Sequence, residues 1–177
     1  NEVKVTLKLE GNIHYEIKQM GEEYARGFSQ SPGIISEKGA YLAGSTYWLP
    51  WFNDHLITFE LTTTLPEKWD VVSQGKRTRH DIKNGDRITT WECVHPMEEV
   101  YLIAAEFNEY IKKIGKVDVM AFLRTPDESL ANKYLETTSQ YLEMYRNLIG
   151  PYPFSKFALI ENFWETGYGM PSFTLLG

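Results

Sequence analysis

The side chains in this 177-residue chain that could do chemistry are few and widely spaced. The four histidines are His14, His55, His80 and His95, and none has another within five residues. The zinc motif H-E-x-x-H needs two imidazoles one turn apart on one helix face. Pro96 directly follows His95 and would break such a helix. We therefore expect no local zinc motif, and a site built from distant histidines is a weaker alternative to ordinary strand and surface histidines.

Candidate nucleophiles and acid/base groups are equally sparse. Cys93 is the only cysteine and lies within a strand-like segment, where a buried, inert thiol is expected. No G-x-S-x-G elbow is present. Glu161 and Glu165 bracket an aromatic turn and could form an acid/base pair. Without a nucleophile or metal nearby, a solvated or tethering role is the favoured interpretation.

The segment Gly167–Ser172 is a glycine-bracketed turn of the kind whose backbone can approach a ligand. Its Gly-x-Gly spacing matches neither a phosphate-binding loop nor a dinucleotide motif. A plain tight turn that needs glycine for its φ angles is the alternative.

Short strands would position these groups. Apolar residues alternate over Val3–Leu9 and again from residue 57 to 62, which predicts half-buried strands. Asn84-Gly85 between two strand patterns predicts a type I′ hairpin. Gly21–Lys38 is interpreted mostly as loop, and Pro50–Asp54 as a bend. Strands at about ten-residue spacing predict a β-sandwich.

The pattern changes after residue 124. Thr125–Glu128 resembles a capping box, with proline at the first helical position. A helix is predicted at about 126–149, followed by a strand at about 154–161. The helix has a single apolar face, consisting of Leu130, Tyr134, Tyr141, Tyr145 and Leu148. We therefore predict a mainly β protein, with a β-sandwich N-terminal domain at 1–124 and the truncated start of an α+β catalytic domain at 125–177.

Composition excludes some functions. The net charge of −6 and the lack of a basic patch argue against nucleic-acid binding. No apolar run approaches the roughly 20 residues of a membrane span. We expect the apolar faces of the helix and of strand 154–161 to pack on the sandwich, oligomerise or swap in the isolated chain.

Several segments, taken together and in order, resemble one family. They are Tyr47–Phe52 (YWLPWF), Phe59–Val72 (FELTTTLPEKWDVV), Thr90–Leu102 with its T-W…P-M…Y-L run, and Ile149–Phe157 (IGPYPFSKF). The series resembles the N-terminal part of the aminopeptidase N-like zinc metallopeptidases, or gluzincins. The resemblance implies a fragment without the catalytic helix, and upstream sequence is also expected. The parent would bind zinc and hydrolyse peptide bonds. For this chain alone it implies no catalytic residue, no metal ligand, no cofactor and no activity; its partners would be the rest of the catalytic domain and, in the parent, a peptide.

In that family the next strand ends in G-A-M-E-N, whose backbone pairs with the substrate and whose Glu holds the free α-amine. The resemblance therefore implies that Tyr168, Gly169, Met170, Pro171 and Ser172 line the substrate cleft. Gly169-Met170 matches, but Pro171-Ser172 stands where E-N is expected. A carboxylate is the natural partner of an ammonium. The altered motif therefore supports a peptidase relative without implying aminopeptidase specificity.

Two other functions stay open. A carbohydrate- or protein-binding β-sandwich would present an exposed, coplanar aromatic row, with Tyr41, Tyr47, Trp48 and Trp51 as candidates. An inactive peptidase homologue used as a scaffold is also compatible with Pro171-Ser172. The parent's next ~100 residues would decide between active and inactive forms, by the presence of H-E-x-x-H and a distal Glu.

Overall fold

The structure, a computed structural model, describes residues 3–19, 29–50 and 55–177. Strands dominate the described residues and confirm the predicted mainly β class. The strands in the first half of the chain are β1 (Lys18–Gln19), β2 (Ser29–Gln30), β3 (Gly33–Ser36), β4 (Gly39–Leu42), β5 (Ile57–Pro66), β6 (Trp69–Val72) and β7 (Lys76–Lys83). Those in the second half are β8 (Asp86–Met97), β9 (Leu102–Glu106), β10 (Asn108–Ile114), β11 (Val117–Leu123), β12 (Lys156–Glu161), β13 (Gly167–Met170) and β14 (Phe173–Leu176). A 3-10 helix η1 (Gly44–Thr46) and an α-helix α1 (Glu128–Ile149) complete the elements.

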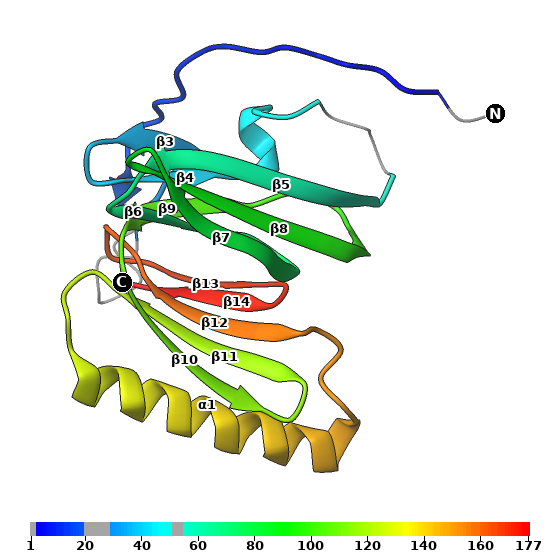
Figure 1. Cartoon of the computed structure of the whole chain (residues 1–177), viewed down its shortest axis with the longest axis vertical. Helices are drawn as coiled ribbons and strands as arrows, with labels where there is room; N and C mark the ends of the chain where they lie inside the picture. Colours follow the sequence, from blue (N-terminus) through cyan, green and yellow to red (C-terminus); the bar gives the residue numbers. More distant parts are fainter. Residues whose placement is uncertain (1–2, 20–28, 51–54) are drawn as a thin grey trace.

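The described strands form four sheets, three of which stack above one another over the helix (Figure 1). Their orders are β5-β8-β7, β3-β4-β9-β6 and β10-β11-β12-β14-β13, with β1-β2 as a separate pair. In the five-stranded sheet, β11, β12 and β14 run parallel to one another, whereas the outer strands β10 and β13 are antiparallel to them. The helix α1 connects β11 to β12, as a crossover between parallel strands requires.

The β7–β8 hairpin forms as predicted. Asn84 and Gly85 connect the two strands with φ angles of 57° and 82°, the positive values that a type I′ turn needs. On the other side of β8, strand β5 alternates between half-buried and exposed residues along its whole length. This confirms the period-two pattern read from Ile57 onward.

Strand β11 has an apolar core on each of its faces. Met120 and Phe122 belong to the main core, which lies between the upper sheets and the five-stranded sheet. Val119, Ala121 and Leu123 belong to a second core under the helix. Residues of opposite parity point to opposite faces of a strand, and here both sets are almost inaccessible to solvent. The five-stranded sheet is therefore the middle layer of the fold.

The helix begins at the predicted signal. Asp127 is the N-cap, and its Oδ1 accepts a hydrogen bond of 2.8 Å from the backbone N–H of Leu130. This satisfies one of the N–H groups that a helix start leaves unpaired.

The predicted apolar face of the helix divides into two parts. Leu130 and Tyr134 pack on the sheet, together with buried Leu135. Tyr141 and Leu148 are exposed, at 53% and 69%. The first part of the predicted apolar face is therefore buried against the sheet, whereas Tyr141 and Leu148 are not covered by it.

Two N-terminal predictions differ from the structure. Residues Val3–Leu9 form no strand, and the four apolar side chains among them are 60% or more exposed. Alternation supplies a face for packing, but a strand also needs a partner. This arm passes above the uppermost sheet without joining it (Figure 1). Within Gly21–Lys38, expected to be mostly loop, the described part contains β2 and β3. Most of the predicted bend Pro50–Asp54 lies outside the described residues.

The predicted domain division at residues 124 and 125 falls inside the middle layer. Strand β11 lies before this point and β12 lies after it, yet they pair in parallel from Asp118↔Lys156 to Phe122↔Ile160. The sandwich and the following segment thus share one hydrogen-bonded sheet, and the division into two domains stays a prediction.

Candidate functional site

The predicted turn at 167–172 is mostly a strand. Gly167–Met170 forms β13, which pairs antiparallel with β14 and is the outer strand of the five-stranded sheet. Only Pro171 and Ser172 form the turn between them. The sequence did not predict β14, and without that partner the glycine-rich segment resembles a turn. An outer strand carries backbone N–H and C=O groups that are open to pairing with a further strand.

Beside β13 lies a pocket of about 400 Å³. Four separate parts of the chain build it: the end of β2, β4 with η1, the connection between β8 and β9, and β13. The side chains and backbone that line it are Gln30, Ser31, Pro32, Tyr41, Ala43, Ser45, Glu99, Tyr101, Tyr168, Gly169 and Met170. The volume is within the range of small-ligand sites.

Glu99 is the ionisable acid of this pocket, and two hydrogen bonds hold it in place. Its Oε2 accepts from the backbone N–H of Gly44 at 2.6 Å, and its Oε1 accepts from the hydroxyl of Tyr101. The carboxylate therefore joins η1 to the β8–β9 connection. Each carboxylate oxygen can accept two hydrogen bonds, so both keep acceptor capacity for a ligand.

Aromatic rings form the wall around this carboxylate. Tyr41 and Tyr168 stack with ring centroids 6.4 Å apart and planes 19° from parallel. Burial raises the pKa of Tyr41, and the charges of Tyr168 and Glu99 act in the same direction. Burial also raises the pKa of Tyr101, as does its hydrogen bond to Glu99. Both hydroxyls are therefore neutral donors at physiological pH.

Ser172 occupies a different environment from its neighbours in the sequence. It is 2% exposed, and its φ of 71° is unusual for a residue with a side chain. Its Oγ accepts from the Nζ of Lys156 at 2.8 Å and from the backbone N–H of Gly75 at 3.3 Å. These two hydrogen bonds fix the turn to the core.

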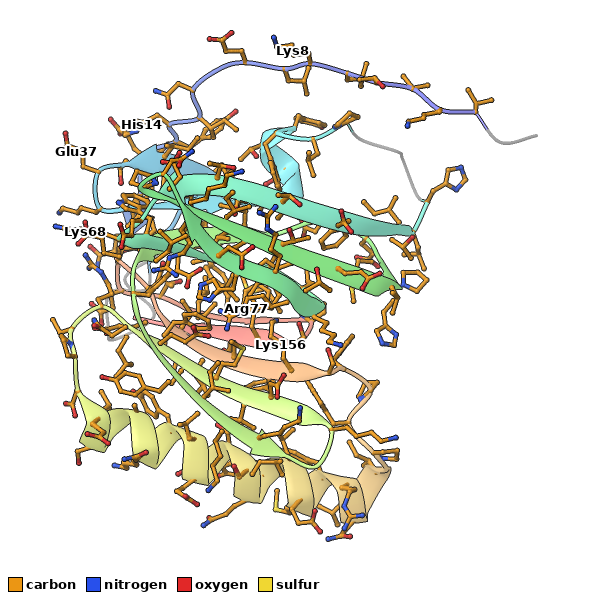
Figure 2. All side chains as sticks on the ribbon, in the orientation of Figure 1. Lys8, His14, Glu37, Lys68, Arg77 and Lys156 are labelled. Atoms are coloured by element: carbon orange, nitrogen blue, oxygen red, sulfur yellow. The ribbon has the colours of Figure 1, made fainter. Side chains whose placement is uncertain are left out.

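Lys156 is a fully buried amine at the start of β12. Figure 2 shows it in the interior near Arg77, between the upper sheets and the five-stranded sheet. Its Nζ also donates to the carbonyl oxygen of Ser172 and lies 4.9 Å from the ring centre of Trp91. Burial is the main cause that lowers the pKa of Lys156 well below its ordinary 10.5.

The structure therefore separates the five residues predicted to line the cleft. Tyr168, Gly169 and Met170 lie together at the pocket. Pro171 is exposed at the end of the hairpin, and Ser172 points into the core. The substrate-binding role of all five stays a prediction.

Glu99, Tyr101 and Ser31 line the pocket without having been recognised in the sequence. Glu99 and Tyr101 lie in the β8–β9 connection and Ser31 directly follows β2, so no local motif brings the three together.

The other groups singled out in the sequence have structural roles. The Oε2 of Glu161 accepts from the backbone N–H of Arg124 at 2.7 Å, which is a tethering role, and Glu165 is exposed. The thiol of Cys93 is 1% exposed, and burial raises its pKa. Its burial agrees with the predicted inert thiol.

Among the described residues, one cluster has donor atoms that could hold a metal ion, and it consists of Asp70, His80 and Glu109. These residues are already paired. His80 Nε2 lies 2.7 Å from Asp70 Oδ2 and 3.1 Å from an Arg87 guanidinium nitrogen, and Arg77 lies 2.6 Å from Glu109. Two guanidinium groups so close would repel a divalent cation. The cluster therefore does not fit the zinc that the sequence resemblance implies for the parent.

The proposed aromatic row is not a continuous exposed surface. Tyr41 is 5% exposed, and the indole N–H of half-buried Trp48 donates to the carbonyl oxygen of Val100. Tyr47 is 71% exposed, and Trp51 lies outside the described residues. This arrangement gives no support to a sugar-stacking platform.

Comparison with solved structures identifies a fold. The chain is similar to an M1 zinc metallopeptidase from Deinococcus radiodurans at 17% identity, a TM-score of 0.60, and coverage of 81% of this chain and 37% of that chain. A two-domain M1 zinc metallopeptidase mutant bound to L-arginine is 18% identical with a TM-score of 0.64. The match covers 90% of this chain and 40% of that chain. A mutant of the Deinococcus radiodurans enzyme, bound to a Tyr-Ser-Ala substrate, is 17% identical with a TM-score of 0.63. The match covers 92% of this chain and 40% of that chain. No protein-family model and no curated protein matches the chain.

The fold is therefore that of the N-terminal region of M1 metallopeptidases, and the chain spans about two fifths of the length of these structures. In the described part of the chain, no helix has the length and apolar character needed to cross a membrane.

Proposed function

We propose that this chain is a non-catalytic part of a zinc metallopeptidase-like protein and forms one side of its substrate-binding cleft. In this proposal an extended peptide pairs with the outer strand β13, and part of the peptide enters the pocket beside it. The full-length protein would hydrolyse peptide bonds with zinc held by residues outside this chain. No zinc ligand is assigned to the residues described above.

The position of β13 carries the proposal. It is the outer strand of its sheet, and three of its four residues, Tyr168, Gly169 and Met170, line the pocket. Strand addition to a sheet edge gives affinity through the main chain, and adjacent pockets give specificity through side chains or chain ends. Two similar structures support the ligand class, since one is bound to a Tyr-Ser-Ala substrate and another to L-arginine.

The local backbone also favours close approach. A Cβ added at Gly169 would meet no atom within 4 Å, so the strand is open at this position. Ser172 is anchored to Lys156 and Gly75, which holds the end of the hairpin in place. The strand therefore has an open face at Gly169 and a fixed end at Ser172, and a preorganised strand binds at a lower entropic cost.

Binding at this edge can be tested by amide chemical shifts. We expect a blocked tripeptide, N-acetyl-Ala-Val-Ala-amide, to shift the amide signals of residues 167–170. The matched control is β10 (Asn108–Ile114), the opposite outer strand of the same sheet, whose amides should not move. An analogue with N-methylated backbone amides should bind much more weakly, because it cannot pair as a strand. Equal shifts at both edges, or equal binding of the methylated analogue, would refute the proposal.

A further inference from the structure

Residues 3–10, which we call the N-terminal arm, have the sequence pattern of a strand but pair with no described strand. Val3, Val5, Leu7 and Leu9 alternate with polar residues, and each of these four side chains is 60% or more exposed. In an extended segment they point to one side. A contiguous row of exposed apolar side chains marks a surface that contacts another element.

The outer strand β5 has an apolar face that is only partly covered. Phe59 and Leu61 are half-buried, whereas Cys93 and Trp91, which lie opposite them on β8, are 1% and 0% exposed. The difference arises because no described strand lies beyond β5 in the order β5-β8-β7. A further strand at this edge would cover the apolar face and pair with the open backbone groups of β5.

The arm is attached where it can serve as that strand. The backbone N–H of Ile35 donates to the carbonyl oxygen of Ile13 at 2.8 Å, and that of Tyr15 donates to the carbonyl oxygen of Gly33 at 3.0 Å. From this anchor on β3 the arm passes above the sheet that contains β5 (Figure 1). Gly11 lies between arm and anchor, and a Cβ there would meet no atom within 4 Å, so the backbone is free to bend at this point.

We propose that the arm closes onto the edge of β5 as a fourth strand of the β5-β8-β7 sheet. In this closed position Val5 and Leu7 continue the apolar face that Phe59 and Leu61 begin. The eight residues of the arm match most of the ten residues of β5. The closed arm also protects an edge that is otherwise open to pairing with another chain.

Charge favours the same pairing. When the apolar residues of the arm face the core, Lys4 and Lys8 lie on the opposite face of the sheet, together with exposed Glu60 of β5. Opposite charges on neighbouring strands stabilise a sheet, both directly across and diagonally.

The other outer strands fit the arm less well. Lys76 and Lys83 are exposed on β7 and would repel the lysines of the arm. Strands β10 and β13 belong to the five-stranded sheet, which the upper sheets separate from the arm (Figure 1). The arm of a second copy has the same side chains, but the tether gives the chain's own arm a much higher effective concentration at β5.

The first test is amide hydrogen exchange of the unaltered chain, followed by NMR. Alternate amides of the arm should exchange at least about tenfold more slowly than in an unstructured peptide, because tenfold protection corresponds to an arm that is closed about nine tenths of the time. Backbone nuclear Overhauser contacts should connect the arm to β5. Unprotected amides throughout the arm, or contacts to a different strand, would overturn the proposal.

The second test places one lysine on either face of the arm. Leu7→Lys should abolish the protection, because it puts a charge on the face that packs beside Phe59 and Leu61. Thr6→Lys is the matched control and should preserve the protection, since Thr6 lies on the face of Glu60. Both side chains are exposed in the structure, so neither change should disturb the rest of the fold. Equal protection in the two variants would show that no apolar face is buried.

The third test distinguishes the chain's own arm from that of a second copy. Analytical ultracentrifugation should show a monomer at the concentrations at which the arm is protected. A dimer whose formation raises the protection, and which Leu7→Lys dissociates, would show that the arm is exchanged between copies and would overturn closure within one chain. Neither result bears on the proposed function, because β13 belongs to a different sheet.

Discussion

Replacement of the buried amine by Lys156→Met should change how the stability of the protein depends on pH. Lys156 is 2% exposed, and its pKa is lowered well below 10.5, mainly by burial. Its Nζ lies next to Ser172 and to the rings of Trp91 and Phe173. No carboxylate of the described residues forms an ion pair with it. The folded chain therefore binds the proton of Lys156 less tightly than the unfolded chain does.

The sign of the effect follows from proton counting. Between the folded pKa and 10.5, the unfolded chain binds one proton at Lys156 that the folded chain does not bind. Stability rises with pH wherever the unfolded state binds more protons, at about 1.4 kcal/mol per pH unit for one group. The stabilisation is complete above about pH 10.5 and is lost as the pH falls toward the folded pKa. The methionine variant cannot bind this proton, so its free energy of unfolding lacks this dependence on pH.

The assay is urea unfolding of both proteins at pH 7.5, 8.5 and 9.5. The free energy of unfolding of the wild type, minus that of Lys156→Met, should increase with pH, by at most about 1.4 kcal/mol per pH unit. Cys93 interacts electrostatically with Lys156, so both proteins are best made in a Cys93→Ala background. Lys133→Met is the matched control, because Lys133 is exposed on α1 and lysine and methionine have similar helix propensities. The free energy of unfolding of the wild type, minus that of Lys133→Met, should not change with pH.

A flat difference for Lys156→Met as well would refute the reasoning. The amine would then be charged in the folded state, stabilised by the faces of Trp91 and Phe173.

Three further predictions concern the fold and metal binding. Gly75→Ala should destabilise the protein by roughly 3 kcal/mol or more, because Gly75 has φ +87° and a Cβ would lie 2.1 Å from the carbonyl oxygen of Glu92. Gly169→Ala, which meets open space, is the control and should change stability by less than about 1 kcal/mol in chemical denaturation. Asp127→Ala should lower the free energy of unfolding by about 1 kcal/mol by the same measurement, since it removes the N-cap. Asp127→Asn should retain most of this stability, because asparagine also caps helices. Equal losses in the two variants would exclude a capping role. The chain should retain no tight equivalent of zinc after dialysis, and one equivalent that disappears in His80→Ala would show that the cluster of potential ligands binds metal despite its guanidinium neighbours.

Local signals predicted the elements whose partners are close in sequence. The Asn84-Gly85 hairpin forms as expected, because the turn itself fixes the pairing of its flanking strands. The helix start at Asp127 also follows from local hydrogen bonding between a side chain and the backbone. The strand predicted from the alternation over Val3–Leu9 does not form, because no described strand pairs with this segment.

The candidate site could be predicted only in part. Tyr168, Gly169 and Met170 were identified from glycine spacing and motif resemblance, and they do lie at the pocket. Ser172 belongs to the same motif but points into the core, because the left-handed turn directs its hydroxyl toward Lys156. Glu99 resembled any other surface acid in the sequence.

The sequence by itself determined the mainly β class, the hairpin, the helix start and the segment that becomes the outer strand. These depend on periodicity and on turn or capping chemistry within a few residues. The tertiary structure alone decided that β13 is a strand edge, that Lys156 is buried, and that Glu99 lines one pocket with Tyr41 and Tyr168. The physical reason is that these contacts join residues more than 50 positions apart or depend on strand pairing across a shared sheet, so their energy comes from long-range packing that no local pattern encodes.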